Sequence, residues 1–248
     1  MITDYKLDKS VPIPLYYQLK TIIQTEIDKG SYQPDDIIPT EEELIHIFGV
    51  SRTTVRQAIS ELVQEGQLYR IKSKGTFVAH KKINQDFIIR LEPFNDQIRK
   101  QNKTPKTQVL ALDIVIPPIQ AAQALGLGPN DKAIFLSRQR FADDCPLVVV
   151  QTYLPYSRCA FVMDHDFTAE SLYNILENEN PAYKIRYVKR VMEAAKVSSA
   201  NAKLLEIKTG DPVLFFTSTG YTQDDIPLEY SMAYYRADCN KFEITVMA

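Results

Sequence analysis

Two adjacent segments carry most of the structural information in this chain: Ile38-Pro39-Thr40-Glu41-Glu42-Glu43-Leu44 and Phe48-Gly49-Val50-Ser51-Arg52-Thr53-Thr54-Val55-Arg56-Gln57-Ala58. Thr40 followed three residues later by Glu43 forms a capping box, which predicts a helix that begins at Glu41. Gly49 then permits a tight turn, and Ser51 is placed to cap a second helix. Together the two segments predict a helix-turn-helix.

The second of these helices has two different faces. Val55, Ile59 and Leu62 share one side, which predicts that this side is buried. Another side carries the polar and long side chains Arg52, Thr53, Arg56 and Ser60. Because Arg52 and Arg56 are one turn apart, both guanidinium groups can reach guanine edges or phosphates in a major groove. An ordinary solvated helix face has the same spacing, so the spacing alone leaves both interpretations open.

A basic hairpin follows the second helix. Gly66 ends the helix, and residues 68–71 and 76–79 have the composition of two short strands around Lys72-Ser73-Lys74-Gly75. A basic hairpin after a helix-turn-helix is typical of a wing. Lys72 and Lys74 are placed to neutralise phosphates, which predicts salt-dependent binding to nucleic acid.

Residues 14–80 resemble the winged-helix DNA-binding domain of the GntR family of bacterial transcription regulators. The matching motifs are Pro14-Leu15-Tyr16-Tyr17-Gln18-Leu19, Ile38-Pro39-Thr40-Glu41, Gly49-Val50-Ser51-Arg52-Thr53-Thr54-Val55-Arg56 and Gly75-Thr76-Phe77-Val78. The resemblance implies DNA contacts by Arg52, Thr54 and Arg56, and a wing tip at Gly75 that enters the minor groove. Glu42 stands where many members have arginine, so we expect an operator that differs from the family's commonest sequence.

The positive charge is local rather than global. The chain has a formal net charge of −2 and a pI near 6.0, which argues against a strongly basic nucleic-acid binder. The basic residues that favour DNA gather along the wing and its exit, at Arg70, Lys72, Lys74, Lys81 and Lys82. Such a limited patch suits a protein that places two copies on DNA.

The length of 248 residues predicts two domains, each able to bury a core. We expect a DNA-binding domain over residues 1–80, a linker over 81–90 and an effector-binding and dimerisation domain over 91–248. The start of the sequence lacks a basic region followed by an apolar run, and no segment is apolar enough to span a membrane. We therefore expect a cytoplasmic protein with no membrane contact.

Neither metal nor cofactor is expected. The three cysteines, Cys145, Cys159 and Cys239, are widely spaced, which favours reduced thiols over disulfides or a zinc site. Asp164-His165-Asp166 has no second cluster to complete a coordination shell, so a polar loop is the preferred interpretation. The sequence also lacks a Walker loop and a nucleophile elbow.

The second domain is predicted to be α+β, with a mainly antiparallel sheet. Helices are expected at residues 94–100, 119–125, 169–178 and 198–207. Strands are expected at residues 107–116, 133–141, 147–154, 184–196, 213–221, 228–235 and 242–246. The turn signals at residues 143–146 and 224–227 leave no room for a helix between strands, which predicts antiparallel hairpins.

Residues from about 90 to 246 resemble the UTRA effector-binding domain of the HutC subfamily, whose fold is related to chorismate lyase. The marks are Arg138-Gln139-Arg140-Phe141-Ala142-Asp143, Tyr153-Leu154-Pro155, Ser171-Leu172-Tyr173, Gly210-Asp211-Pro212-Val213, Pro227-Leu228-Glu229-Tyr230 and Tyr235-Arg236-Ala237-Asp238. The resemblance implies a ligand pocket lined by Arg138, Arg140, Ser171, Glu229 and Tyr235. Val150 departs from the pattern, because sugar-phosphate-binding members often have glutamate there.

Arg138 and Arg140 alternate along one strand, so both point to the same face of the sheet. Two converging guanidinium groups fit a phosphate or carboxylate ligand. Internal pairing with Glu229 or Glu193 would explain them equally well, and the residues alone leave this open.

We therefore expect a homodimeric transcription regulator, a repressor, that binds operator DNA and is released by a small anionic effector such as a phosphosugar or small carboxylic acid. The competing hypothesis is a chorismate-lyase-like enzyme with an accessory DNA-binding head. It ranks behind, because the sequence shows no activated nucleophile and no acid–base pair.

Overall fold

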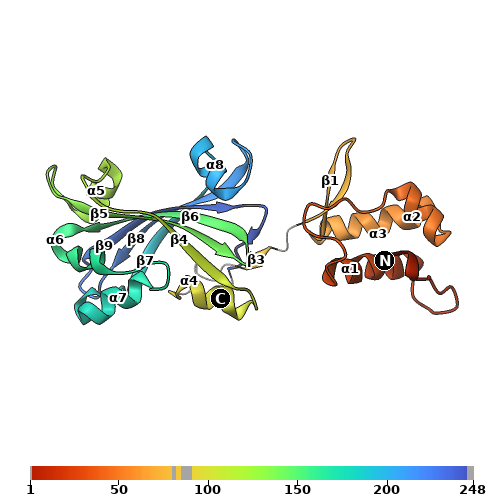
Figure 1. The fold of residues 1–248 in the computed structure, drawn as a ribbon, viewed down its shortest axis with the longest axis horizontal. Coiled ribbons are helices and arrows are strands. Elements are labelled where there is room, and N and C mark those ends of the chain that lie inside the picture. Colours follow the sequence, from red (N-terminus) through yellow and green to blue (C-terminus); the bar gives the residue numbers. More distant parts are fainter. Residues whose placement is uncertain (1, 80–81, 85–90, 245–248) are drawn as a thin grey trace. The chain divides into compact units, whose positions relative to one another are not determined.

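The computed structural model describes residues 2–79, 82–84 and 91–244 (Figure 1). It divides the chain into two compact units, Met1–Lys82 and Ile83–Ala248, which we describe separately. The division falls within the expected linker at residues 81–90. Residues 81 and 85–90 of that linker, and residue 80 before it, lie outside the described residues.

The first unit is the expected winged helix-turn-helix. Its elements are the 3-10 helix η1 (Ile2–Asp4), the helices α1 (Leu15–Asp28), α2 (Glu41–Phe48) and α3 (Arg52–Gln64), and the strands β1 (Leu68–Ile71) and β2 (Gly75–Val78). The two strands pair as an antiparallel hairpin. The core lies between the three helices and the base of the hairpin, and includes Leu19, Ile23, Leu44, Val55, Ile59, Leu62 and Leu68.

Local sequence signals explain where α2 and α3 begin. The Thr40 side chain accepts from the Glu43 N–H, and the Glu43 carboxylate accepts from the Thr40 N–H, which completes the predicted capping box. Gly49 has a φ of 61°, the left-handed conformation that glycine adopts without strain. Ser51 caps α3 by accepting from the Thr54 N–H at 3.2 Å. These three predictions are confirmed.

The second unit is built on one six-stranded antiparallel sheet. The strands are β4 (Pro105–Val115), β5 (Ala133–Ala142), β6 (Cys145–Pro155), β7 (Tyr187–Lys196), β8 (Pro212–Tyr221) and β9 (Pro227–Arg236). Their order across the sheet is β4-β5-β6-β9-β8-β7, with β4 and β7 at the edges. The prediction of an α+β domain with antiparallel pairing is confirmed.

One predicted strand is wrong and one strand pair was not foreseen. Residues 242–244 form no strand, and the rest of the expected 242–246 strand lies outside the described residues. Instead β10 (Asn240–Lys241) pairs in parallel with β3 (Ile83–Asn84). Such a short parallel pair joins residues far apart in sequence, so no local pattern announces it.

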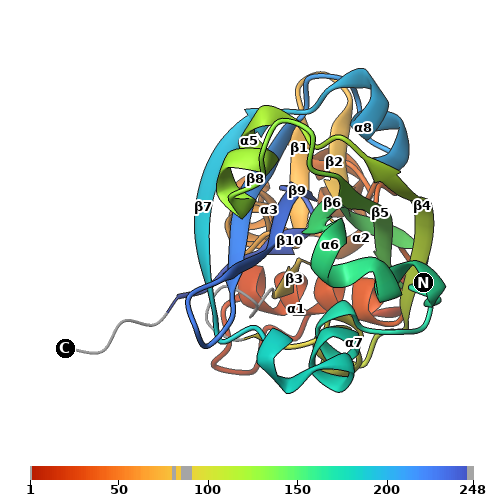
Figure 2. The ribbon, with the colours of Figure 1, turned by 90° about the vertical axis from the view of Figure 1, so that its left-hand side faces the viewer.

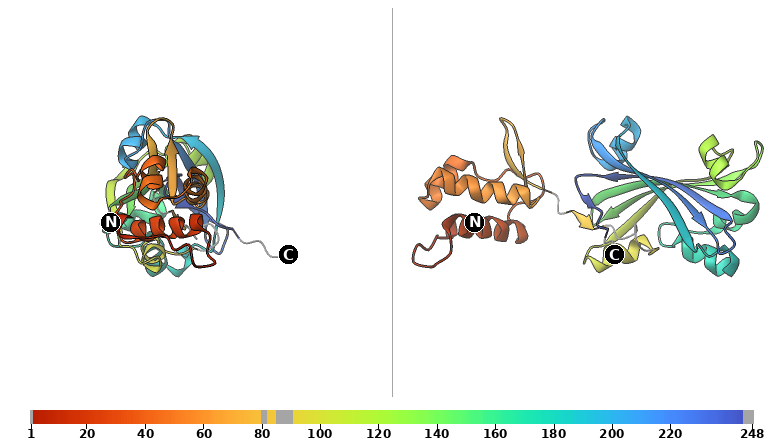
Figure 3. Two further views of the ribbon diagram at one scale, coloured as in Figure 1. Left: turned by 90° about the vertical axis from the view of Figure 1, so that its right-hand side faces the viewer. Right: turned by 180° about the vertical axis from the view of Figure 1, so that it is seen from behind.

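Helices cover both faces of the sheet. They are α4 (Phe94–Lys100), α5 (Ile119–Leu125), α6 (Tyr156–Cys159), α7 (Leu172–Glu179) and α8 (Ser199–Leu205), with the 3-10 helices η3 (Ala160–Asp164) and η4 (Pro181–Tyr183). In Figures 1, 2 and 3, α5 and α8 lie on one side of the sheet and α7 on the other. Figures 1 and 3 place α4 on the same side as α7. The α4 and α7 side holds the cavity described below.

Candidate functional site

The recognition helix α3 presents one buried and one exposed face. Val55, Ile59 and Leu62 are buried in the core of the first unit. Arg52 and Arg56 are exposed, and the side chain of Arg52 is 75% exposed. Both arginines are therefore available to bases or phosphates, as a major-groove contact requires.

Glu41 connects the start of α3 to the wing, a role that the sequence did not reveal. Its carboxylate lies 3.8 Å from Nε of Arg52 and 3.4 Å from Nη2 of Arg70. Thr54 has a different surrounding, because its hydroxyl is 2.8 Å from Oγ of the cap residue Ser51. Glu41 thus holds two cations of the DNA-facing unit, while Thr54 belongs to the helix cap.

The wing combines an exposed basic tip with a stiff base. Lys72 and Lys74 are exposed in the turn between β1 and β2. Tyr69 stacks on Phe77 with ring centroids 5.5 Å apart and donates to Asp35 at 2.7 Å. Gly75 has a φ of 129°, and a Cβ there would come within 2.7 Å of Ile37. The fold itself therefore requires glycine at this position.

A cavity opens on the α4 and α7 side of the sheet in the second unit. It is lined by all five residues that the sequence selected, namely Arg138, Arg140, Ser171, Glu229 and Tyr235. Strand register explains the convergence: Arg138 pairs with Val150, Val150 with Ala233, and Ala233 with Phe216. These four residues form one rung of the sheet, and all of them line the cavity.

The two arginines are held in the cavity by aromatic rings. Arg138 is 3% exposed, stacks over Phe167 at 5.7 Å and donates from Nη2 to the Thr152 hydroxyl at 3.4 Å. Arg140 stacks over Phe94 at 5.0 Å. Among the described residues, Nε of each arginine has no hydrogen-bond partner. A buried donor without a partner is costly, so the pair favours binding of an anion.

Burial also disfavours the charge on these groups. It lowers the pKa of Arg138 to about 9, with the neighbouring Arg140 as a further cause. The pKa of Arg140 is lowered for the same main reason. Arg138 still carries its charge at neutral pH, because the lowered value lies above it. A bound anion would relieve this penalty.

Internal carboxylates compensate the arginines only in part, because the charge of Glu229 raises the pKa of both without a direct contact. Within the described part of the chain, no ion pair joins Arg138 or Arg140 to Glu229 or Glu193. Glu229 instead accepts a hydrogen bond from the Tyr173 hydroxyl at 2.6 Å, and Glu193 is exposed on β7. Gly220 leaves room for the Glu229 carboxylate, since a Cβ there would lie 3.2 Å from Oε2. The alternative that the sequence left open is therefore not what the structure forms.

Two further predicted residues offer hydrogen bonds to a ligand. Ser171 stands at the N-cap of α7, but its side chain makes no cap hydrogen bond and lines the cavity. The first amides of such a helix have no acceptor within it. Tyr235 packs edge-on against Phe216, and burial raises the pKa of its hydroxyl to about 12. Tyr235 is thus a neutral donor at any physiological pH.

Sequence reasoning missed several residues of the cavity wall. Arg190, Ser218 and Ser231 face one another across β7, β8 and β9, and all three line the cavity. Glu92 and Gln97 join the wall from the segment around α4. A serine at an inward strand position was a usable signal, because an inward position in a sheet core is otherwise apolar. No pattern pointed to Glu92.

The described residues show neither a metal-binding cluster nor a membrane-spanning helix. They contain no group of three His, Cys, Asp or Glu side chains placed to hold a metal ion. His165 instead contacts Glu170, with Nδ1 2.7 Å from Oε2. Across the same residues, every helix is too short or too polar to cross a bilayer.

The comparison with family models matches both units. Residues 15–78 match the bacterial regulatory proteins of the gntR family, and residues 100–240 match the UTRA domain. The chain belongs to the GntR family, HutC subfamily. It is therefore a sequence-specific DNA-binding transcription regulator with a domain for an effector ligand.

Several relatives of this GntR regulator are similar over most of their length. The transcriptional repressor NagR of Bacillus subtilis is 33% identical over 232 residues, which cover 94% of each chain. The histidine utilization repressor of Pseudomonas aeruginosa is 29% identical over 204 residues, 82% of this chain and 80% of that protein. The crystal structure of PhnF from Mycobacterium smegmatis covers 92% of this chain and 99% of its own, with a TM-score of 0.68 and 23% identity, and supports the fold.

Proposed function

We propose that this GntR regulator is a repressor that leaves its operator when a small anionic metabolite binds the cavity at Arg138 and Arg140. The observation that carries the proposal is the pair of guanidinium groups, each with an Nε donor that has no partner among the described residues. A phosphate or carboxylate can accept from both forks. The named relatives that act as repressors support the sign of regulation.

The rest of the cavity favours a hydroxylated ligand. Ser218, Ser231 and the Glu229 carboxylate also line the cavity and offer groups that hydrogen-bond to hydroxyls. Val150, Ala233 and Phe216 add an apolar wall on the same rung as Arg138. A phosphosugar or a hydroxylated carboxylic acid fits this lining. Val150 cannot hold an amide or ammonium group, so we expect weaker selection for an amino sugar than a glutamate there would give.

The DNA contacts are proposed at Arg52, Arg56 and the wing lysines, Lys72 and Lys74. All four side chains are exposed, and α3 carries the first two at adjacent turns. Gly75 sets the bend of the wing, and Thr54 supports the cap that orients Arg52. The arginines would read base edges, and the lysines would contact phosphates.

The active form is proposed to be a homodimer joined through the effector unit. Two heads are needed because one recognition helix reads only a short half-site. Val191 and Met192 support this placement, since they are 58% and 50% exposed on the edge strand β7. In the full chain, replacing both by Lys should lower the sedimenting mass to that of a monomer. The matched control Ile13→Lys, at an exposed position of the first unit, should remain dimeric.

The ligand proposal is tested by thermal shift and by release from DNA. Phosphosugars and small hydroxy acids would be screened for a rise in the melting temperature of the wild-type chain. Compounds that stabilise it would then be added to the operator complex in gel-shift titrations. If no anionic compound both stabilised the protein and released it from DNA, the proposed mode of regulation would be wrong.

A further inference from the structure

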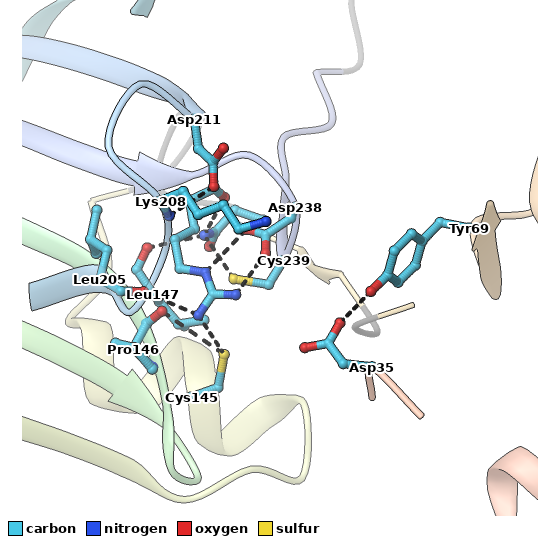
Figure 4. Close-up of polar contacts among 12 residues, drawn as sticks. Asp35, Tyr69, Cys145, Pro146, Leu147, Leu205, Lys208, Asp211, Asp238 and Cys239 are labelled. Atoms are coloured by element: carbon cyan, nitrogen blue, oxygen red, sulfur yellow. Dashed lines mark hydrogen bonds and ion pairs between the residues drawn. The ribbon is translucent and has the colours of Figure 1, made fainter. Parts of the chain in front are cut away.

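Two cysteines far apart in sequence meet at the end of the sheet in the second unit. Cys145 is the first residue of β6, and Cys239 lies in the turn between β9 and β10. Figure 4 shows their side chains within one cluster of polar contacts. The Cys145 side chain is the largest cause of the raised pKa of Cys239, and Arg236 donates to the Cys145 sulfur. The wide sequence spacing favoured reduced thiols, and all three cysteines are free, with the side chains of Cys145 and Cys239 in one cluster.

The surroundings distinguish the two sulfurs. Cys145 is half-buried and receives a hydrogen bond from Nη1 of Arg236 at 3.8 Å, whereas Cys239 is 2% exposed. The Cys145 contact and burial raise the pKa of Cys239. A guanidinium that donates to a half-buried sulfur provides the electropositive surrounding in which reactive cysteines are found. Cys145 is thus the reactive thiol, and Cys239 is placed to resolve it.

Arg236 is fixed in position by several groups. It forms a bidentate pair with Asp238, at 2.6 Å and 3.1 Å, and donates to the Leu205 carbonyl at 3.2 Å. Asp238 reduces the positive charge that Cys145 experiences, and its side chain is 47% exposed. The reactivity of Cys145 should therefore depend on Asp238.

The thiol pair adjoins the point where the chain enters the second unit. The backbone carbonyl of Cys239 accepts from the N–H of Ile83 at 2.8 Å, next to the β3–β10 pair. Lys82 is the last residue of the DNA-binding unit, and Ile83 is the first of the effector unit. A covalent bond at Cys239 would therefore act on the backbone that holds β3.

We propose that Cys145 and Cys239 form a redox-sensitive dithiol, which a hydroperoxide oxidises to a disulfide. The disulfide loosens the β3–β10 pair and thereby lowers operator affinity. The effect on DNA rests on the proposed function as a repressor, whereas the oxidation does not. Both side chains lie in the cluster of polar contacts around Arg236, so disulfide formation requires the two thiols to turn toward each other within that cluster.

The chemistry is a two-electron oxidation of two thiols. The Cys145 thiolate attacks one peroxide oxygen, the O–O bond breaks, and an alcohol or water leaves after protonation, so that Cys145 becomes a sulfenic acid. The sulfur of Cys239 then attacks the sulfur of Cys145. The S–S bond forms, and the hydroxide leaves as water with the proton from Cys239. An added dithiol reverses the step by exchange.

The test treats the full chain with hydrogen peroxide, blocks the remaining thiols by alkylation and maps the peptides by mass spectrometry. We expect a peptide pair linked through Cys145 and Cys239, and an operator affinity about tenfold lower that dithiothreitol restores. Cys145→Ser and Cys239→Ser should each lose both effects. Cys159→Ser is the matched control and should keep both, because that thiol is buried and its pKa is raised to about 12.

A second variant tests the role of the cation. Asp238→Asn removes the carboxylate that partly offsets Arg236, so alkylation of Cys145 by iodoacetamide should become several-fold faster. The absence of a linked peptide in the wild type, or an equal peroxide-dependent loss of operator affinity in Cys145→Ser, would overturn the dithiol. A disulfide that left operator affinity unchanged would overturn its regulatory effect. If the reduced chain bound no operator, the repressor proposal would fail while the peptide map still tested the dithiol.

Discussion

The arginines proposed to bind DNA and those proposed to bind the effector differ in their exposure to solvent. On α3, Arg52 is 75% exposed and contributes nothing to the core beneath it. In the cavity, Arg138 is 3% exposed and stacks on Phe167 inside the fold. An exposed cation is solvated until DNA displaces the water, whereas a buried cation is poorly solvated until a ligand arrives. Substitution of Arg52 should therefore leave the stability of the fold unchanged, whereas substitution of Arg138 should change it.

The largest effect is expected from removing the buried pair. Arg138→Ala with Arg140→Ala should weaken effector binding at least about 100-fold, since hydrogen bonds to charged groups contribute about 1.5–3 kcal/mol each. Operator affinity should stay within a few fold of the wild type. Calorimetry with the effector and gel-shift titration would measure the two quantities.

Arg158→Ala, at an exposed position on α6, is the control for that experiment and should bind effector normally. A double variant that still left DNA at the wild-type effector concentration would show that the arginines serve the fold and that the ligand binds elsewhere.

Removing Arg52 or Arg56, the exposed arginines of α3, should weaken operator binding and leave stability unchanged. Arg52→Ala or Arg56→Ala should cost about 1–3 kcal/mol of specific operator binding, the range for a lost base contact. The free energy of unfolding should change by less than about 0.5 kcal/mol, as for most surface substitutions. Arg99→Ala, exposed on α4, controls for the loss of one positive charge. Unchanged operator titrations would remove α3 from the DNA interface.

Features set by neighbouring residues could be predicted from the sequence, whereas contacts between distant segments could not. The capping box at Thr40 and Glu43 and the alternation of Arg138 with Arg140 are local patterns, so the helix start and the shared sheet face were both predictable. The link between Glu41 and Arg70 was not, because it joins α2 to the wing. The β3–β10 pair likewise depends on residues at opposite ends of the second unit.

Inorganic phosphate should stabilise the fold through the buried arginine pair and not through the exposed arginines of α3. At a tenfold excess over its dissociation constant, a ligand that binds the native state raises the free energy of unfolding by about 1.4 kcal/mol. We expect phosphate to raise the melting temperature of the wild type and to leave the Arg138→Ala, Arg140→Ala variant unchanged relative to chloride at equal ionic strength. Equal shifts in both proteins would mean that phosphate acts on the surface.

The wing lysines should act through charge alone. Lys72→Ala or Lys74→Ala should weaken binding to operator and to unrelated DNA by similar factors, because phosphate contacts carry no sequence information. The slope of log affinity against log salt should become shallower by about 0.9 for each contact removed. Competition titrations at several salt concentrations would measure it. A loss confined to the operator would show that a lysine reads a base instead.

The smallest effect is expected at Glu41, which links the exposed cations. Its carboxylate competes with DNA for Arg52 and Arg70, so Glu41→Gln should strengthen operator binding by up to about 1 kcal/mol, the upper range for an exposed ion pair. The free energy of unfolding should hardly change, because an exposed ion pair contributes little to stability. Asp28→Asn is the matched control, because it removes an equal charge from an exposed residue of the same unit without releasing either arginine. The difference between the two variants therefore isolates the release of the arginines from the general loss of negative charge. If both variants gained the same operator affinity, Glu41 would act only through its charge. If Glu41→Gln lost operator affinity, the role of Glu41 would be to hold Arg52 in the geometry that DNA requires.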